Sequence, residues 1–68
     1  MGFKVGDMVC LKKDKVFKTP FDMHGMHFEV IAGTEGMVID IDKNMLIAVK
    51  FGILAAGWCT IFDIEKLS

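Results

Sequence analysis

The segment 23–27, Met-His-Gly-Met-His, contains the residues most suited to binding a metal ion. Imidazole and thioether groups suit soft ions such as Cu(I), and a glycine lets a loop fold around an ion. His24 and His27 are therefore the candidate metal ligands. The Cys-x₂-Cys and His-x₃₋₅-His pairs of structural zinc modules are absent. A surface loop whose methionines cover one end of the fold explains the same residues without a metal, and we expect no bound metal or cofactor.

Cys10 and Cys59 are the two cysteines, and they lie on the first and last predicted strands. They would form a redox pair only if those strands run side by side. Neither lies in a Cys-x-x-Cys motif or next to a histidine, the settings that lower a thiol pKa. We interpret both as unreactive, partly buried thiols. No serine or threonine lies in a context that supports a nucleophilic triad, and no glycine-rich phosphate loop is present. The sequence therefore predicts that the protein is not an enzyme.

The lysines are concentrated near the N-terminus. Residues 1–18 contain five lysines and two acids, whereas the remainder contains three lysines and seven acids, and the chain has no arginine. Lys12, Lys13 and Lys15 would attract an acidic partner. The same segment, with Phe17, leaves open a nucleic-acid-associated barrel of the KOW type. The absence of arginine removes the bidentate fork that reads bases and clamps phosphates.

An apolar connection precedes the last predicted strand. Residues 53–56 are Ile-Leu-Ala-Ala, and Trp58 follows after one glycine. Contiguous apolar surface of this kind marks protein interfaces, and tryptophan is enriched at their centres. We therefore predict a partner-binding surface with Ile53, Leu54 and Trp58 at its centre and the three lysines at its rim. The alternative is that this connection folds over one end of the protein as a plug.

Short runs with a two-residue apolar period predict five strands, at residues 8–11, 27–31, 37–41, 46–51 and 58–64. The segment 33–51 is a predicted hairpin that organises the rest, with Asn44 as the pivot of its turn because asparagine tolerates a left-handed backbone. The residues predicted to face inward are Val5, Val9, Leu11, Phe28, Val30, Val38, Ile47, Val49, Phe51 and Phe62.

With 68 residues, of which 53% are hydrophobic and 25% charged, the chain is expected to form a single globular domain spanning 1–68. Closing the sheet is the economical way for so small an all-β domain to remove its edges. We expect an SH3-like barrel of about five antiparallel strands, with Leu67 closing one end. The sequence shows neither a signal peptide nor an apolar run long enough to span a bilayer, so we expect a cytoplasmic protein.

Several short motifs resemble those of small SH3-like barrel subunits. One set of motifs resembles the variable chain of ferredoxin–thioredoxin reductase: Val5-Gly6-Asp7, the segment 21–25, Glu29-Val30 and Val49-Lys50-Phe51. A second set resembles the ferredoxin-docking S subunit of the photosynthetic NDH complex: the segments 33–38, 48–51 and 61–67, together with Trp58. The resemblance implies a cofactor-free interaction subunit, an acidic redox protein or enzyme subunit as partner, and a stromal location if the protein is photosynthetic. We therefore expect a small, non-catalytic subunit of a larger complex, in electron transfer if the resemblance holds.

Overall fold

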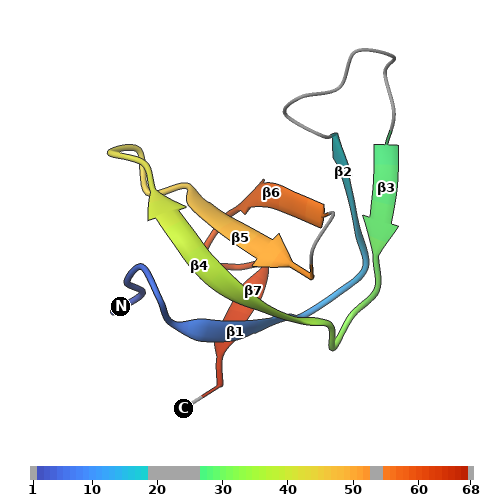
Figure 1. Cartoon of the computed structure of the whole chain (residues 1–68), viewed down its shortest axis with the longest axis horizontal. Coiled ribbons are helices and arrows are strands. Elements are labelled where there is room, and N and C mark those ends of the chain that lie inside the picture. Colours follow the sequence, from blue (N-terminus) through green and yellow to red (C-terminus); the bar gives the residue numbers. More distant parts are fainter. Residues whose placement is uncertain (1, 19–26, 53–54, 68) are drawn as a thin grey trace.

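The structure, a computed structural model, describes residues 2–18, 27–52 and 55–67. Five strands form an antiparallel sheet in the order β6-β5-β4-β1-β7, and the other two form a separate hairpin, β2–β3 (Figure 1). The strands are β1 (Met8–Leu11), β2 (Lys15–Lys18), β3 (His27–Val30), β4 (Glu35–Ile41), β5 (Ile47–Phe51), β6 (Ala55–Cys59) and β7 (Ile64–Lys66). The prediction of an all-β domain with antiparallel strands is confirmed.

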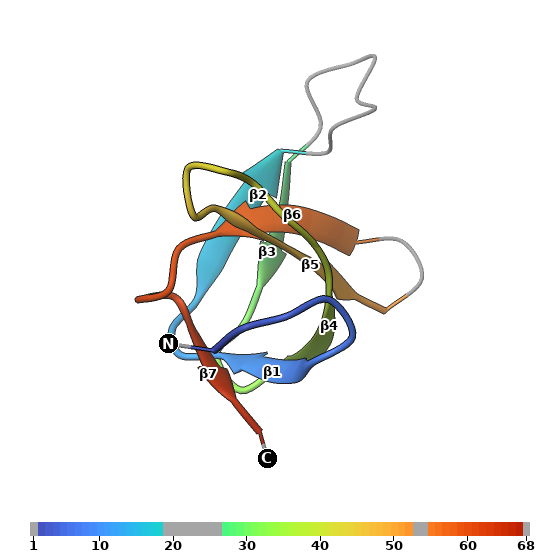
Figure 2. The same ribbon diagram turned by 90° about the vertical axis from the view of Figure 1, so that its left-hand side faces the viewer.

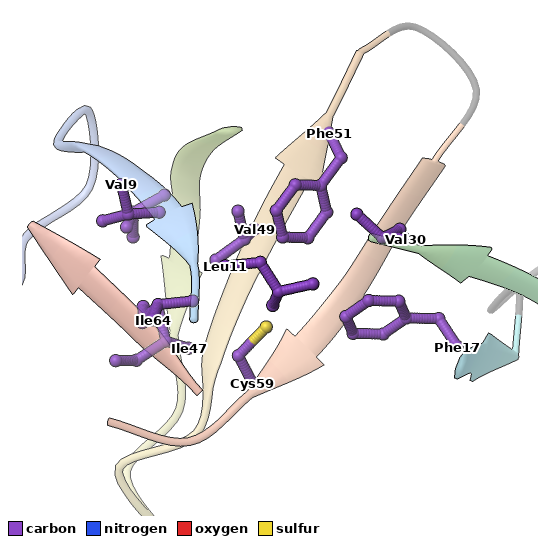
Figure 3. Close-up of a cluster of buried hydrophobic side chains, with 10 residues drawn as sticks. Val9, Leu11, Phe17, Val30, Ile47, Val49, Phe51, Cys59 and Ile64 are labelled. Atoms are coloured by element: carbon purple, nitrogen blue, oxygen red, sulfur yellow. The ribbon is translucent and has the colours of Figure 1, made fainter. Parts of the chain in front are cut away.

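The core lies on the concave side of the five-stranded sheet, where alternate residues of β1, β4 and β5 point inward. Val9, Val38 and Val49 are completely buried, as the two-residue period predicts. Figure 3 shows how side chains from the sheet and from the hairpin meet in this interior. The buried cluster consists of Val9, Leu11, Phe17, Val30, Val38, Ile47, Val49, Phe51, Cys59 and Ile64.

The sheet curls around its core but does not close by backbone pairing (Figure 2). β1 pairs with β4 on one side and with β7 on the other, which leaves β6 and β7 as the two edges of the sheet in the described part of the chain. The expectation of a closed barrel is therefore wrong. The open side is covered by side chains of the β2–β3 hairpin, so closure depends on packing instead of on a ladder of hydrogen bonds.

Phe17 joins the hairpin to the sheet. Its ring centroid lies 5.8 Å from that of Phe28 and 5.7 Å from that of Phe51. Its ring also lies directly over Gly57 of β6, where an added Cβ atom would be 2.1 Å from Phe17 Cδ1. Such a close approach requires glycine at position 57. None of the five predicted strands covers β2, because a four-residue strand with lysine at both ends gives little apolar signal.

Several residues near the strand ends differ from their predicted environment. Val5 is 62% exposed and Leu67 is 42% exposed, so neither closes the core. Val5 lies in the turn before β1, where the alternation does not yet apply. The predicted strand 58–64 is divided into the end of β6, a turn, and the start of β7, and Phe62 in that turn is 74% exposed.

The turn between β4 and β5 also pivots one residue later than predicted. Met45, not Asn44, has the positive φ angle of 68°. Asp42 N donates to Leu46 O at 2.8 Å, and Met45 N donates to Asp42 O at 2.9 Å. This arrangement matches a short hairpin loop whose last residue is left-handed, a position that usually holds glycine. Methionine there carries a backbone cost, because its Cβ crowds the following carbonyl.

We therefore expect Met45→Gly to raise the free energy of unfolding by about 1 kcal/mol, the cost of a left-handed non-glycine residue. The side chain is 57% exposed, so little burial is lost. Urea denaturation of the variant and the wild type measures the difference. Asn44→Gly is the matched control, since its φ is not positive and added backbone freedom should lower stability. A Met45→Gly variant less stable than the wild type would contradict this account of the turn.

Candidate protein-interaction surface

The turn between β6 and β7 is tied to the hairpin by a single carboxylate. Asp63 Oδ2 accepts hydrogen bonds from Lys15 Nζ at 2.7 Å, from Thr60 N at 2.8 Å and from Thr60 Oγ1 at 3.1 Å. Thr60 Oγ1 in turn accepts from Phe62 N at 3.2 Å. The ammonium of Lys15 also lies 5.6 Å from the centre of the Phe17 ring. Lys15 is therefore part of the fold, and its charge is already neutralised.

This network changes the titration of Asp63. Partial burial raises the pKa of Asp63, but the hydrogen bonds from Lys15 and Thr60 lower it by more, so the pKa lies below the ordinary value of 3.8. A carboxyl with a lowered pKa in the folded state stabilises the protein above the unfolded-state pKa. That stabilisation is lost as the pH falls through the lower, folded-state pKa.

We expect Asp63→Asn to lower the free energy of unfolding at pH 7 by roughly 1 kcal/mol, the usual net value of a lost charge-assisted hydrogen bond at a partly exposed site. The difference between variant and wild type should shrink as the pH falls below about 4, because Asp63 then binds a proton in the unfolded chain, and it should vanish once the pH falls below the lower folded-state pKa. Urea denaturation at pH 7 and pH 3 measures both values. Glu29→Gln, a change at an exposed residue of β3, is the control and should have little effect at either pH. A pH-independent cost for Asp63→Asn would contradict this assignment.

The two thiols lie on opposite sides of the sheet. Cys59 is completely buried, whereas Cys10 is partly exposed and points away from the core, opposite Glu35 and Glu65. Two strands, β4 and β5, separate β1 from β6, so the imagined redox pair is not formed. Cys59 belongs to β6 and not, as predicted, to the last strand. Burial raises the pKa of the Cys59 thiol to about 11, against a small opposing effect of Lys15.

We expect one fast and one slow thiol in the folded protein. Cys10 should react with an aromatic disulfide reagent within minutes at pH 8, and Cys59 should react only at the rate at which the fold opens, because the thiolate is the nucleophile and Cys59 remains a buried thiol. Absorbance of the released thiolate measures both phases. Cys10→Ser should abolish the fast phase alone, and 6 M urea should merge the two. A Cys59 that reacts as fast as Cys10 under native conditions would contradict the described burial.

The outward side of the sheet carries several exposed apolar side chains on neighbouring strands. Residues directly opposite one another across the strands are Met8 with Met37, Met37 with Lys50, and Lys50 with Ala56. In the next row Trp58 lies opposite Ala48. The register of β4 shifts between Val38 and Asp40, which makes Ile39 an extra, exposed residue beside these rows. We call this surface the outer apolar face; it consists of Met8, Met37, Ile39, Ala56 and Trp58 around Lys50.

These side chains are too exposed to belong to a core. Met8, Met37, Ile39 and Trp58 are 44%, 41%, 42% and 45% exposed, respectively. Residues opposite one another on neighbouring strands lie about 5 Å apart, so the methionines and Lys50 form a continuous row. Contiguous apolar surface of this kind is uncommon on a monomer without a binding role. The face can bind an apolar surface of another molecule.

The structure places the predicted partner-binding residues in different regions. Trp58 is on the outer apolar face. Lys12 and Lys13 are exposed and follow the C-terminal end of β1, whereas Met8 lies at its N-terminal end. The ammonium of Lys15 forms an ion pair with Asp63, and its role in partner binding stays a prediction. Ile53 and Leu54 lie outside the described residues.

The structure does not describe the side chains of the two predicted metal ligands, His24 and His27. His24 lies outside the described residues, and of His27 only the backbone, at the start of β3, is described. Within the described ranges, no three potential ligands among histidine, cysteine, aspartate and glutamate lie close enough to hold an ion. The metal-site prediction therefore stays a prediction.

Phe17, the aromatic residue of the basic segment, is part of the core. Only 4% of it is exposed, and its ring contacts Phe28 and Phe51. A buried ring cannot stack on a nucleic-acid base. The structure therefore gives no aromatic platform at the site that the sequence offered for nucleic acid.

Comparisons with known proteins do not assign this chain to a family. No family model, no curated protein and no solved structure matches the chain. Among the residues that the structure describes, no helix is long and apolar enough to cross a membrane. The function must therefore be argued from the surface itself.

Met8, Met37, Ile39 and Lys50 are functional candidates that the sequence analysis did not select. The alternation that identified Val9 and Leu11 as inward also placed Met8 on the opposite side of β1. Alternation alone does not show that Met37, Lys50 and Trp58 come from neighbouring strands in matching register. The pairings of β4 with β1 and with β5 supply that information.

Proposed function

We propose that this chain is a non-catalytic protein-interaction module, a small subunit that docks onto a larger protein through the outer apolar face. The observation that carries the proposal is the joining of Met8, Met37, Ile39 and Trp58 into one exposed surface by three strand pairings. Covering this surface would remove apolar area from water at about 25 cal/mol per Å². Methionine and tryptophan are among the residues enriched in such contacts.

The size of the domain supports the same proposal. A domain of 68 residues buries a smaller share of its surface than a larger one, and it gains stability from a partner that covers exposed apolar side chains. Met8 and Met37 give the contact flexible, polarizable side chains that adapt to the shape of the other surface. Ile53 and Leu54, which shortly precede Ala56 and Trp58 in the sequence, stay predicted binding residues.

A narrower proposal concerns the partner. Lys12 and Lys13 are exposed and, in the described structure, form no ion pair. They would steer an acidic protein toward the domain and raise the association rate at low salt. The resemblance to ferredoxin-docking barrels supports an acidic redox protein, such as a ferredoxin, or an enzyme subunit of an electron-transfer complex. Association should then slow with added salt, while the apolar contact itself depends little on salt.

The test is affinity capture from the organism that makes the protein, run in parallel with the wild type and two variants. Trp58→Asp places a charge on the outer apolar face, and Phe62→Asp places the same charge on a more exposed aromatic residue in the turn outside this face. We expect a partner that the wild type and Phe62→Asp retain and that Trp58→Asp loses. Circular dichroism and urea denaturation confirm that both variants are folded. A partner lost with Phe62→Asp and kept with Trp58→Asp would overturn the proposal.

A further inference from the structure

A single positive charge lies in the middle of the outer apolar face. Lys50 has Met37 directly opposite on one side and Ala56 on the other, and Trp58 lies diagonally across the β5–β6 pair. Lys50 is exposed, and within the described residues no carboxylate lies within ion-pair distance of its ammonium. Its direct neighbours across the strands are therefore apolar. Glu35 and Asp40 also lie on this side of β4, but neither forms an ion pair with Lys50.

This charge decides what can cover the face. A surface that buries Lys50 removes water from its ammonium, which is unfavourable unless an anion takes the place of the water. A purely apolar surface would leave the charge without a partner. A carboxylate opposite Lys50 compensates for the lost hydration with a charge-assisted hydrogen bond.

The same charge disfavours a second wild-type copy of the chain. Two copies packed face to face about a twofold axis through this patch would bring Lys50 opposite Lys50. Like charges directly opposite one another are destabilising, and the cost grows when water is excluded. Lys50 therefore opposes self-association through a face that would otherwise favour it.

We propose that the outer apolar face is specific for a different protein that presents a carboxylate within an apolar surface, with that carboxylate bound to Lys50. This inference rests on the proposed function and adds the chemistry of the partner. The chain itself provides a probe with that chemistry. In the Lys50→Glu variant a carboxylate replaces the ammonium, while the apolar residues around it are unchanged.

The experiment is an NMR titration of ¹⁵N-labelled wild type with unlabelled Lys50→Glu variant. We expect shifts of the amides around Met37, Lys50 and Trp58, with binding about tenfold tighter than in titrations of wild type with wild type, a difference typical of exchanging a like-charge for an opposite-charge contact. The Lys43→Glu variant makes the same charge change in the β4–β5 turn and serves as the matched control. Mixed and self titrations that agree, or shifts as large with Lys43→Glu, overturn the inference.

Affinity capture separates this inference from the proposed function. With the Lys50→Glu variant as bait, the partner that depends on Trp58 should be lost, and Lys50→Arg should recover it because the positive charge is restored. If Lys50→Glu still retains that partner, the docking face stands and the carboxylate assignment fails. If Trp58→Asp also retains it, the docking face itself fails.

Discussion

Gly57→Ala should lower the free energy of unfolding by about 3 kcal/mol, the upper part of the usual range for overpacking a core. The added methyl group would be 2.1 Å from Phe17 Cδ1 and 2.7 Å from two further ring carbons. The ring is held between Phe28 and Phe51, so it has little room to move. Because a domain of this size is stable by only about 3–10 kcal/mol, the variant is expected to be near its unfolding threshold. Urea denaturation measures the loss.

Relief of the clash identifies its cause. Phe17→Leu replaces the ring with a smaller side chain, so the double variant with Gly57→Ala should be more stable than the sum of the two single changes predicts, by about 1 kcal/mol or more. Ala56→Ser, at the neighbouring position on the outward side of β6, is the control and should cost little. Additive effects of Gly57→Ala and Phe17→Leu would show that the hairpin does not rest on Gly57.

Gly36→Ala should be about as costly, roughly 3 kcal/mol, but for a different reason. A Cβ atom at position 36 would lie 2.7 Å from Val49 Cγ1, 2.8 Å from the carbonyl oxygen of Lys50 and 2.9 Å from Phe51 Cδ1. The carbonyl belongs to the backbone of β5, and β4 and β5 are held together by their ladder of hydrogen bonds. The methyl group therefore fits only if the two strands move apart.

A second substitution at the nearest side chain should distinguish the two glycine variants, because the clash at Gly57 is with a side chain and the clash at Gly36 is also with the backbone. Val49→Ala removes the nearest side chain from Gly36 but leaves the Lys50 carbonyl in place, so it should not rescue Gly36→Ala in the way that Phe17→Leu rescues Gly57→Ala. Urea denaturation of the two double variants compares these couplings directly. A full rescue by Val49→Ala would show that the strands have more freedom than their pairing indicates.

Much of the fold could be predicted from local patterns. Alternation placed Val9, Leu11, Val38, Val49 and Phe51 correctly in the core, because one buried face imposes a period of two on each strand. The same rule failed for Val5, which lies in a turn, and for Phe62, which Thr60 and Asp63 hold in a turn by side-chain hydrogen bonds. Such local hydrogen bonds compete with strand formation, and a hydrophobic pattern does not reveal them.

Two features were less predictable: whether the sheet closes into a barrel, and which residues form the outer apolar face. A five-strand pattern is compatible with a closed and with an open sheet, and the hairpin that covers the open side was hidden in a lysine-rich segment. The outer apolar face depends on the register among β1, β4, β5 and β6, which no single stretch of sequence contains. Trp58 was predicted as a binding residue from its residue type and the apolar segment that precedes it. Lys50, by contrast, lies in a strand where it had no apparent role.

The pairing of β1 with β7 has a consequence for biosynthesis. Leu11 lies opposite Ile64, so one flank of β1 has no neighbour until almost the whole sequence has left the ribosome. A nascent chain arrested before residue 64 should expose Val9 and Leu11, and it should be held by chaperones and degraded readily. The domain is thus expected to complete its fold only after β7 has left the ribosome.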